Sequence, residues 1–369
     1  MLCSIVNNIC DLKKNIHIMA KKKAQSGGVF RKFIILMVII LVIALAFTGI
    51  NYYMKYFGPN VTGKEEYLYI HTGSKFDDVY KKIKDEGIVK DTASFYWAAL
   101  NMNYVNRVKP GRYHLHEGTS NRRLINMLAS GSQEPVTISF HNLRLKEQFA
   151  GFIAKKIEPD STAIINLLDS TAFVQKFGFT TDNVYTMFLP NSYQIYWNTS
   201  PQKFFKRMYA NYEKFWTPER RQKAAAIGLS PIQVSILASI VDAEALHDDE
   251  MPTIAGLYLN RLRKGIKLES DPTVIFAKND FTIRRVLKKY LSTDSPYNTY
   301  LHTGLPPGPV MMPSVNAVNS VLDYKKSDYL YMCAKPDFSG YHNFATNAAD
   351  HHANAVRYQQ ALNERNIKK

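Results

Sequence analysis

"SPIQVSILASIVDAEALHDDEMPTIAGLYLNRLRKG" (Ser230–Gly265) is the stretch from which the fold prediction starts. It opens with the signature of a helix N-terminus, because Ser230 is a favourable N-cap, Pro231 suits the first helical position and Gln233 completes a capping box. The residues that follow are almost entirely apolar up to Val241. The pattern predicts a buried helix that becomes acidic near its end without leaving helical periodicity.

One carboxyl shares the apolar stripe of this helix. The i, i+3, i+4, i+7 spacing puts four side chains on one face: Leu237, Ile240, Val241 and Glu244. Asp242 lies two residues before Glu244, roughly 200° around the helix, and points elsewhere. Because apolar surroundings disfavour a charged carboxylate, we expect the pKa of Glu244 to be raised, as a general acid working near neutral pH requires. Glu244 is therefore a candidate general acid.

Two other roles for Glu244 remain open at this point. It could pair with a basic residue of "NRLRKG" (260–265) and only anchor the helix. It could also bind metal, because Glu244 and His247 repeat a Glu-x-x-His spacing, but such sites need two copies and further glutamates, and one copy is present. No nucleophile elbow, phosphate-binding loop or dinucleotide fingerprint occurs. We expect neither a metal nor a cofactor.

The charge and one apolar run predict a membrane protein. The 369-residue chain has a formal net charge of +16, which favours an anionic partner such as nucleic acid, a membrane surface or an acidic polymer. Residues 33–50 carry no charge and span roughly 27 Å as a helix, close to a bilayer core. Basic residues precede this run, so the N-terminus should be cytoplasmic and the rest periplasmic or extracellular. A cleaved signal peptide is the alternative, but bulky aromatics follow where a small-residue cleavage site belongs. Export argues against nucleic-acid binding.

Turn signals and periodicity divide the chain into five segments of a mixed α+β protein. They are a basic cytoplasmic tail (1–32), a transmembrane helix in the plasma (inner) membrane (33–53), a linker (54–64), a small strand–helix module (65–137) and a larger domain (138–369). Met19, which precedes the basic run, is an alternative start. Cys333 is the sole cysteine after the apolar run, so the exported part contains no predicted disulfide.

Two irregular segments flank the Ser230–Gly265 stretch. "FLPNSYQIYWNTS" (188–200) is rich in turn formers and is expected to be a loop. "DSPYNTYLHTGLPPGPVMMPS" (294–314) has five prolines in 21 residues and is expected to be a stiff irregular loop. Carboxylates, amides, Tyr and Thr are dense in and around this loop, and sugar-binding clefts use such groups for hydroxyls and pyranose faces.

Several motifs in combination resemble the YceG-like, MltG-type endolytic murein transglycosylases. They are "LASIVDAEA", "AGLYLNRLRKGIKLESDPTVIFA", "SPYNTYLHTGLPPGPVMMPS" and "YHNFATNAADHHAN", and the order and spacing match from about residue 65 to the C-terminus. The small module is similar to the LysM-like domain of that family, with "KPGRY" as its clearest marker. "FLPNSYQIY" resembles the Pro-Asp-Thr-Tyr loop of the family, with Asn191 and Ser192 in place of Asp and Thr.

The resemblance implies a membrane-anchored lytic transglycosylase that cleaves nascent peptidoglycan strands between N-acetylmuramic acid and N-acetylglucosamine. The product would carry a 1,6-anhydro end, and the enzyme would limit strand length beside peptidoglycan synthases. The catalytic Glu of the family transfers to Glu244, which would act first as acid and then as base. The substrate-binding residues implied are Asn260, Asp271, Thr273, Tyr297, Asn298 and Tyr300, with Asn191 and Tyr193 from the earlier loop, and "GLPPGP" would stiffen a wall of the cleft.

Two alternatives differ in chemistry. The first is a non-catalytic peptidoglycan-binding scaffold of the cell-wall synthesis machinery. The second is a hydrolytic muramidase, in which Glu244 works with Asp271 or Glu269, since ordinary glycosidases use a pair of carboxylates.

Overall fold

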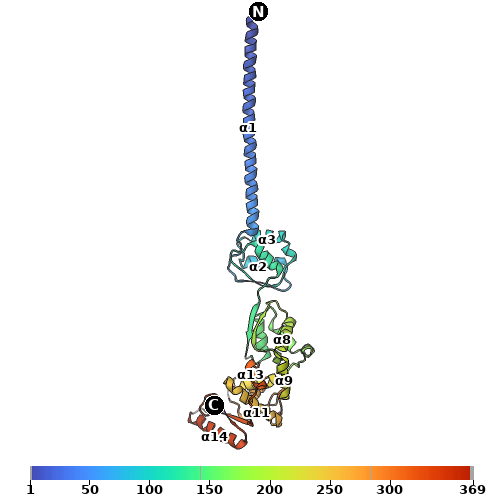
Figure 1. Ribbon diagram of the computed structural model, residues 1–369, viewed down its shortest axis with the longest axis vertical. Coiled ribbons are helices and arrows are strands. Elements are labelled where there is room, and N and C mark those ends of the chain that lie inside the picture. Colours follow the sequence, from blue (N-terminus) through green and yellow to red (C-terminus); the bar gives the residue numbers. More distant parts are fainter. Residues whose placement is uncertain (1, 142, 284, 366–369) are drawn as a thin grey trace. The chain divides into compact units, whose positions relative to one another are not determined.

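The computed structural model describes residues 2–141, 143–283 and 285–365, which form two compact units, Met1–Gln133 and Glu134–Lys369. Each unit contains its own hydrophobic core, and all three sheets among the described residues are two-stranded antiparallel pairs. The protein is thus mainly helical with small sheets, a mixed α+β architecture (Figure 1).

The first unit joins a long helix to a small module. Its elements are α1 (Leu2–Phe57), β1 (Tyr67–Ile70), α2 (Phe76–Asp85), α3 (Thr92–Asn101), η1 (Tyr104–Asn106), β2 (Gly111–His114) and α4 (Asn121–Ser130). β1 pairs with β2 from Tyr67 opposite His114 to Ile70 opposite Gly111. Within α1, Phe30–Phe57 is the helix among the described residues that is long and apolar enough to cross a membrane, with a mean hydropathy of 3.2.

Residues 54–64 do not form the free linker that the turn formers suggested. α1 continues to Phe57, and the backbone N–H groups of Asn60 and Val61 both donate to Thr119 O, at 3.1 and 3.0 Å. Val61 also forms a bridge with Val89. The helix therefore runs directly into the packed module.

The second unit begins with an antiparallel pair of strands that lie far apart in the sequence. β3 (Val136–Phe140) pairs with β4 (Asn191–Ile195), from Val136 opposite Ile195 to Phe140 opposite Asn191. The expected loop at 188–200 is wrong at its centre, because Tyr193 and Ile195 alternate inward as in a strand. Its pairing partner lies more than fifty residues earlier, where local turn propensity gives no sign of it.

The remaining elements of the second unit are helices and one β-hairpin. They are α5 (Lys146–Ala154), α6 (Ser161–Leu168), α7 (Thr171–Val174), η2 (Gln175–Phe177), η3 (Val184–Met187), α8 (Pro201–Phe215), α9 (Pro218–Ala226), α10 (Pro231–Glu244), η4 (Asp248–Glu250), α11 (Met251–Arg263), α12 (Asp271–Lys278), η5 (Lys288–Tyr290), α13 (Val315–Leu322), β5 (Tyr331–Ala334), β6 (His342–Ala345) and α14 (Ala348–Glu364). Residues 291–314 contain no helix or strand. α14 packs on the β5–β6 hairpin (Figure 1).

α10 is the central helix of this unit. Its capping box forms as expected, with Ser230 Oγ accepting from Gln233 N and Gln233 accepting from Ser230 N. It packs against α11, α12 and α13, and every residue from Val234 to Val241 is buried. The helix is therefore enclosed on all sides and not along a single stripe. Its serines tolerate burial because their hydroxyls bond to carbonyls of the same helix, as Ser239 does to Ile236 O at 2.7 Å.

Candidate active site

Glu244 is the last residue of α10, and two hydroxyls hold its carboxyl. Tyr258 Oη of α11 donates to Glu244 Oε1 at 2.9 Å, and Ser270 Oγ, from the N-cap of α12, donates to the same oxygen at 2.6 Å. Three helices thus converge on one carboxyl oxygen. Among the described residues no Lys or Arg bonds to Glu244, so the anchoring ion pair with "NRLRKG" is wrong: Arg261 pairs with Glu269, and Arg263 donates to Tyr324 Oη.

The surroundings of Glu244 favour its protonated form. Burial raises its pKa, the two hydroxyl donors lower it, the Asp271 carboxyl raises it and His342 lowers it, with a raised pKa as the net result. The position adds to this effect, since the C-terminus of a helix carries partial negative charge that opposes a carboxylate. Glu244 as a whole residue is half-buried.

Asp242 points away from Glu244, as the helical spacing predicted, and contacts a different segment. Its Oδ2 accepts the backbone N–H of Ser314, the N-cap of α13, at 2.6 Å. This bond ties the end of the proline-rich loop to α10. The two acids of "DAEA" are therefore directed to different partners.

Asp271 and Tyr300 form a second polar pair beside Glu244. Tyr300 Oη donates to Asp271 Oδ1 at 2.7 Å, and Asp271 is the first residue of α12, directly after Ser270. Burial raises the pKa of Asp271, and the Tyr300 hydroxyl lowers it. The carboxyl of Asp271 is near enough to raise the pKa of Glu244, and Glu244 likewise raises that of Tyr300. The structure thus brings Asp271 and Tyr300 to the predicted catalytic acid.

Thr273 and Asn298 support this arrangement from within the fold. Thr273 Oγ1 donates to Ser270 O at 2.6 Å and lies 2.8 Å from Thr299 Oγ1, which in turn accepts from Ser270 N at 3.0 Å. Asn298 is fully buried, and its amide donates to the backbone oxygens of the loop at 2.9 and 2.8 Å while its Oδ1 accepts from Tyr300 N. Thr273 fixes Ser270, and Asn298 fixes Tyr300.

The other predicted substrate residues make structural contacts elsewhere. Asn260 donates its amide to Ser327 O at 2.6 Å and to Tyr329 O at 3.1 Å, which holds the approach to β5. Tyr297 packs against Phe276, with ring centroids 4.6 Å apart. Gly308 lies so near Tyr297 that a Cβ on it would be 2.6 Å from the phenol oxygen, so a larger residue would not fit.

Asn191 and Tyr193 both lie on β4. Asn191 is exposed and bonds to Ser192 N, while Tyr193 is nearly buried and donates to Leu189 O at 2.5 Å. Burial raises the pKa of Tyr193 to about 12. No hydrogen bond among the described residues links either side chain to the Glu244 cluster.

Four residues of the site were missed by sequence reasoning. Tyr258 and Ser270 hold Glu244, and Glu250 and His342 form a largely buried pair next to it: Glu250 Oε1 accepts the His342 N–H at 2.8 Å, and Oε2 lies 2.7 Å from Nδ1. Ser270 could have been found as the residue preceding the Asp-Pro-Thr helix start. The other three are brought together by tertiary packing, for which the sequence contains no local signal.

The Glu-x-x-His spacing does not produce a paired site. The His247 ring stacks on Tyr341 with centroids 4.0 Å apart, and its Nε2 lies 2.8 Å from Ser339 O. No group of three metal-binding side chains occurs in the part of the chain that the structure describes. Glu244 and His247 therefore face different neighbours.

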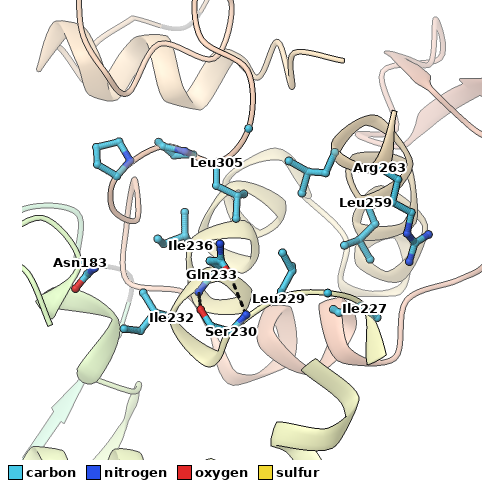
Figure 2. Close-up of a pocket in the computed structure, with 15 residues that line it drawn as sticks. Asn183, Ile227, Leu229, Ser230, Ile232, Gln233, Ile236, Leu259, Arg263 and Leu305 are labelled. Atoms are coloured by element: carbon cyan, nitrogen blue, oxygen red, sulfur yellow. Dashed lines mark hydrogen bonds between the residues drawn. The ribbon is translucent and has the colours of Figure 1, made fainter. Parts of the chain in front are cut away.

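A pocket of about 790 Å³ lies at the start of α10 (Figure 2). Glu244 is at the other end of this helix. It is lined by Ser230 and Gln233 at the helix start, by Leu259 of α11 and by Gly304–Pro307 of the proline-rich loop. The "GLPPGP" segment therefore borders a hollow roughly 20 Å along the helix from the carboxyl, since α10 has 14 residues.

The fold and the site define a class of protein: an apolar N-terminal helix and an α+β unit in which hydroxyls, and no Lys or Arg among the described residues, bond to the Glu244 carboxyl. The YceG-like family profile matches residues 68–357, and the chain belongs to the YceG-like family.

Named relatives and one solved structure agree with this family. The chain is 26% identical over 315 residues to an endolytic murein transglycosylase of Bacillus subtilis, with 80% of this chain and 85% of that protein covered. It is 25% identical over 370 residues to an endolytic murein transglycosylase of Streptococcus pneumoniae, with 89% of this chain but 65% of that protein covered. A crystal structure of a YceG-like protein from Listeria monocytogenes superposes with a TM-score of 0.54 at 22% identity, covering 78% of this chain and 98% of the other, which is a likeness of fold.

Proposed function

We propose that this protein is a membrane-anchored endolytic lytic transglycosylase of peptidoglycan, with Glu244 as its single acid and base. The observation that carries the proposal is the carboxyl of Glu244, whose pKa is raised by burial and whose hydrogen bonds, among the described residues, come from two hydroxyls. Its relatives in Bacillus subtilis and Streptococcus pneumoniae bear the name endolytic murein transglycosylase. A single carboxyl suits this chemistry because the reaction needs no second group to activate water.

Glu244 would transfer one proton twice. Protonated Glu244 gives its proton to the glycosidic oxygen as the bond from C1 to that oxygen breaks. The carboxylate then takes the proton of the 6-hydroxyl of the same sugar as its oxygen bonds to C1, which closes a 1,6-anhydro ring and restores protonated Glu244. Both observed donors use Oε1, so among the described residues Oε2 has no bonded side chain and is the oxygen we assign to proton transfer.

Asp271 and Tyr300 are the substrate-facing groups that we assign next to Glu244. A carboxylate there would stabilise positive charge that develops at C1 during cleavage. We assign Thr273, Asn298 and Asn260 to loop positioning, in keeping with their internal hydrogen bonds. Contacts of Tyr297, Asn191 and Tyr193 with more distant sugars are part of the proposal.

The same proposal places the protein in the plasma (inner) membrane. α1 would be a single-pass anchor with its basic end in the cytoplasm, and the small module and the second unit would lie on the outer side, where nascent strands are made. The small module would be the LysM-like unit that binds glycan, and peptidoglycan synthases would be neighbours.

The acid role predicts how pH dependence responds to the two hydroxyl donors. Cleavage should fall as pH rises through the pKa of Glu244, since a carboxylate cannot protonate the leaving oxygen. Tyr258→Phe or Ser270→Ala removes a donor that favours the carboxylate, so the pKa should rise further and the falling limb should move to higher pH. The control is Tyr185→Phe, whose hydroxyl donates to Leu143 O away from the site and should leave the limb in place. A limb that moves to lower pH in both donor variants contradicts the assignment.

The mass of the products tests the proposed reaction. Uncrosslinked glycan strands digested by the full-length protein in detergent should end in 1,6-anhydro-N-acetylmuramic acid, one water lighter than a reducing end. Reducing ends would instead identify a hydrolytic muramidase, for which Asp271 beside Glu244 is the available partner. Glycan that binds but stays intact would identify a peptidoglycan-binding scaffold.

A further inference from the structure

The C-terminal end of α1 packs directly on the small module. Trp97 of α3 contacts Tyr52 and Tyr56 of α1, with ring centroids 5.1 and 5.0 Å apart, and Lys55 Nζ lies 5.2 Å from the centroid of the Trp97 ring. These aromatic contacts are near-perpendicular, as favourable ring pairs often are. Tyr52 lies only two residues beyond the uncharged run that ends at Ile50.

A buried polar network makes this joint specific. The fully buried Asn121, at the start of α4, donates to Lys55 O at 2.9 Å and to Ser94 Oγ of α3 at 3.0 Å. Its Oδ1 accepts from the amide of Asn60 at 2.8 Å. One amide therefore ties the end of α1 to α3 and α4. Because buried polar groups are costly to leave unpaired, a bent or sliding joint would be unfavourable.

α3 has the uncharged composition of a helix that is buried in protein or in lipid. Its sequence, TASFYWAALN, contains no charged residue, yet Tyr96 is 40% and Leu100 is 49% exposed, and Val105 just beyond it is 38% exposed. A helix that is apolar all round is normally buried in protein or in lipid. The segment that surrounds α3 in the sequence is basic, since Glu117 is its only acidic residue between Asp91 and Leu124. Arg122 of this segment lies over the ring of Phe57, 5.0 Å from its centroid.

We propose that α3 is a second membrane contact, lying in the headgroup layer of the bilayer beside the anchor, with Leu100 and Tyr96 facing lipid and Lys55 and Arg122 facing anionic headgroups. This inference rests on the proposed role of α1 as a membrane anchor. The contact of Trp97 with Tyr52 argues for lipid as the occupant, because Tyr52 lies two residues, or about 3 Å of helix rise, beyond the end of the uncharged run. Aromatic side chains and basic residues are the usual anchors at this depth.

Depth-dependent quenching in vesicles tests the proposal on the full-length chain. Cys3, Cys10 and Cys333 are replaced by Ser, and a single environment-sensitive fluorophore is attached at Leu100→Cys, Lys84→Cys or Ile43→Cys. The vesicles contain phosphatidylcholine and phosphatidylglycerol with lipids spin-labelled either at the headgroup or deep in the acyl chain. Lys84 is an exposed residue of α2, a helix that does not pack on α1, and serves as the matched control.

The proposal expects headgroup spin labels to quench the Leu100 probe several-fold more than the Lys84 probe. Trp97→Ala should reduce that quenching while the Ile43 probe stays quenched by the deep label, because only the packing of α3 on α1 is lost. Replacing phosphatidylglycerol by phosphatidylcholine should also weaken it. Equal quenching at Leu100 and Lys84, with Ile43 still quenched, overturns the proposal and leaves the anchor intact. Loss of quenching at Ile43 overturns the anchor itself and the proposal with it.

Discussion

Glu244→Gln is expected to lower the rate at which glycan strands are cleaved by about 10²–10⁴-fold, the contribution typical of a general acid–base group. The loss should be large because the proposed reaction uses the same carboxyl for both proton transfers. The amide oxygen can still accept from Tyr258 and Ser270, so the fold should be kept. The measurement is the initial rate at which anhydro ends form, compared with the binding of intact strands, which should persist.

Asp242→Asn is the matched control for this variant. It changes a carboxyl of the same helical turn, but one that bonds to Ser314 N and not to the site. We expect a loss of about 1 kcal/mol or a little more in the free energy of unfolding and a rate within a few-fold of wild type. An active Glu244→Gln protein, or an inactive but folded Asp242→Asn protein, would move the catalytic assignment to the other acid.

The parts of this site that could be predicted from sequence are those that one helix encodes. Ser230, Pro231 and Gln233 define where α10 starts, and helical spacing alone separates Glu244 from Asp242. The residues that hold Glu244 could not be found in this way. Tyr258 lies 14 residues later and Ser270 lies 26 residues later, and only the packing of α11 and α12 on α10 brings them together.

The same distinction explains the errors in the fold prediction. β4 reads as a loop because Asn191 and Ser192 at its start, and Pro190 before it, are turn formers, whereas its strand conformation comes from pairing with β3. Residues 54–64 read as a linker because Gly58 and Pro59 are turn formers, but the adjoining Asn60 is committed to the buried amide network. Turn-forming residues show where the chain can turn, but contacts with residues distant in the sequence determine whether such a segment is a loop, a strand or part of a packed module.

Arg261→Ala is expected to cause a large loss of stability, about 2–4 kcal/mol in the free energy of unfolding, most of it from two backbone carbonyls, because Glu269 is exposed. The guanidinium is almost fully buried and donates to Lys267 O at 2.7 Å, to Leu330 O at 2.8 Å and to Glu269. Its removal leaves two backbone carbonyls without their donor and a carboxylate without its cation. The measurement is denaturant unfolding of the second unit, followed by the fluorescence of the buried Trp216.

Arg263→Ala tests whether this loss comes from the buried position or from the charge alone. Arg263 is exposed on the same helix, and the hydrogen bond of its side chain among the described residues is the one to Tyr324 Oη, at 3.0 Å, so its loss should cost less than about 1 kcal/mol. Arg261→Lys should fall between the two, because an ammonium retains the charge but cannot reach three acceptors in the planar geometry of a guanidinium. Since Arg261 fixes residues 267 to 269, directly before Ser270, a folded Arg261→Lys protein should also cleave more slowly. Equal stability losses at Arg261 and Arg263 would mean that the buried hydrogen bonds do not hold this segment in place.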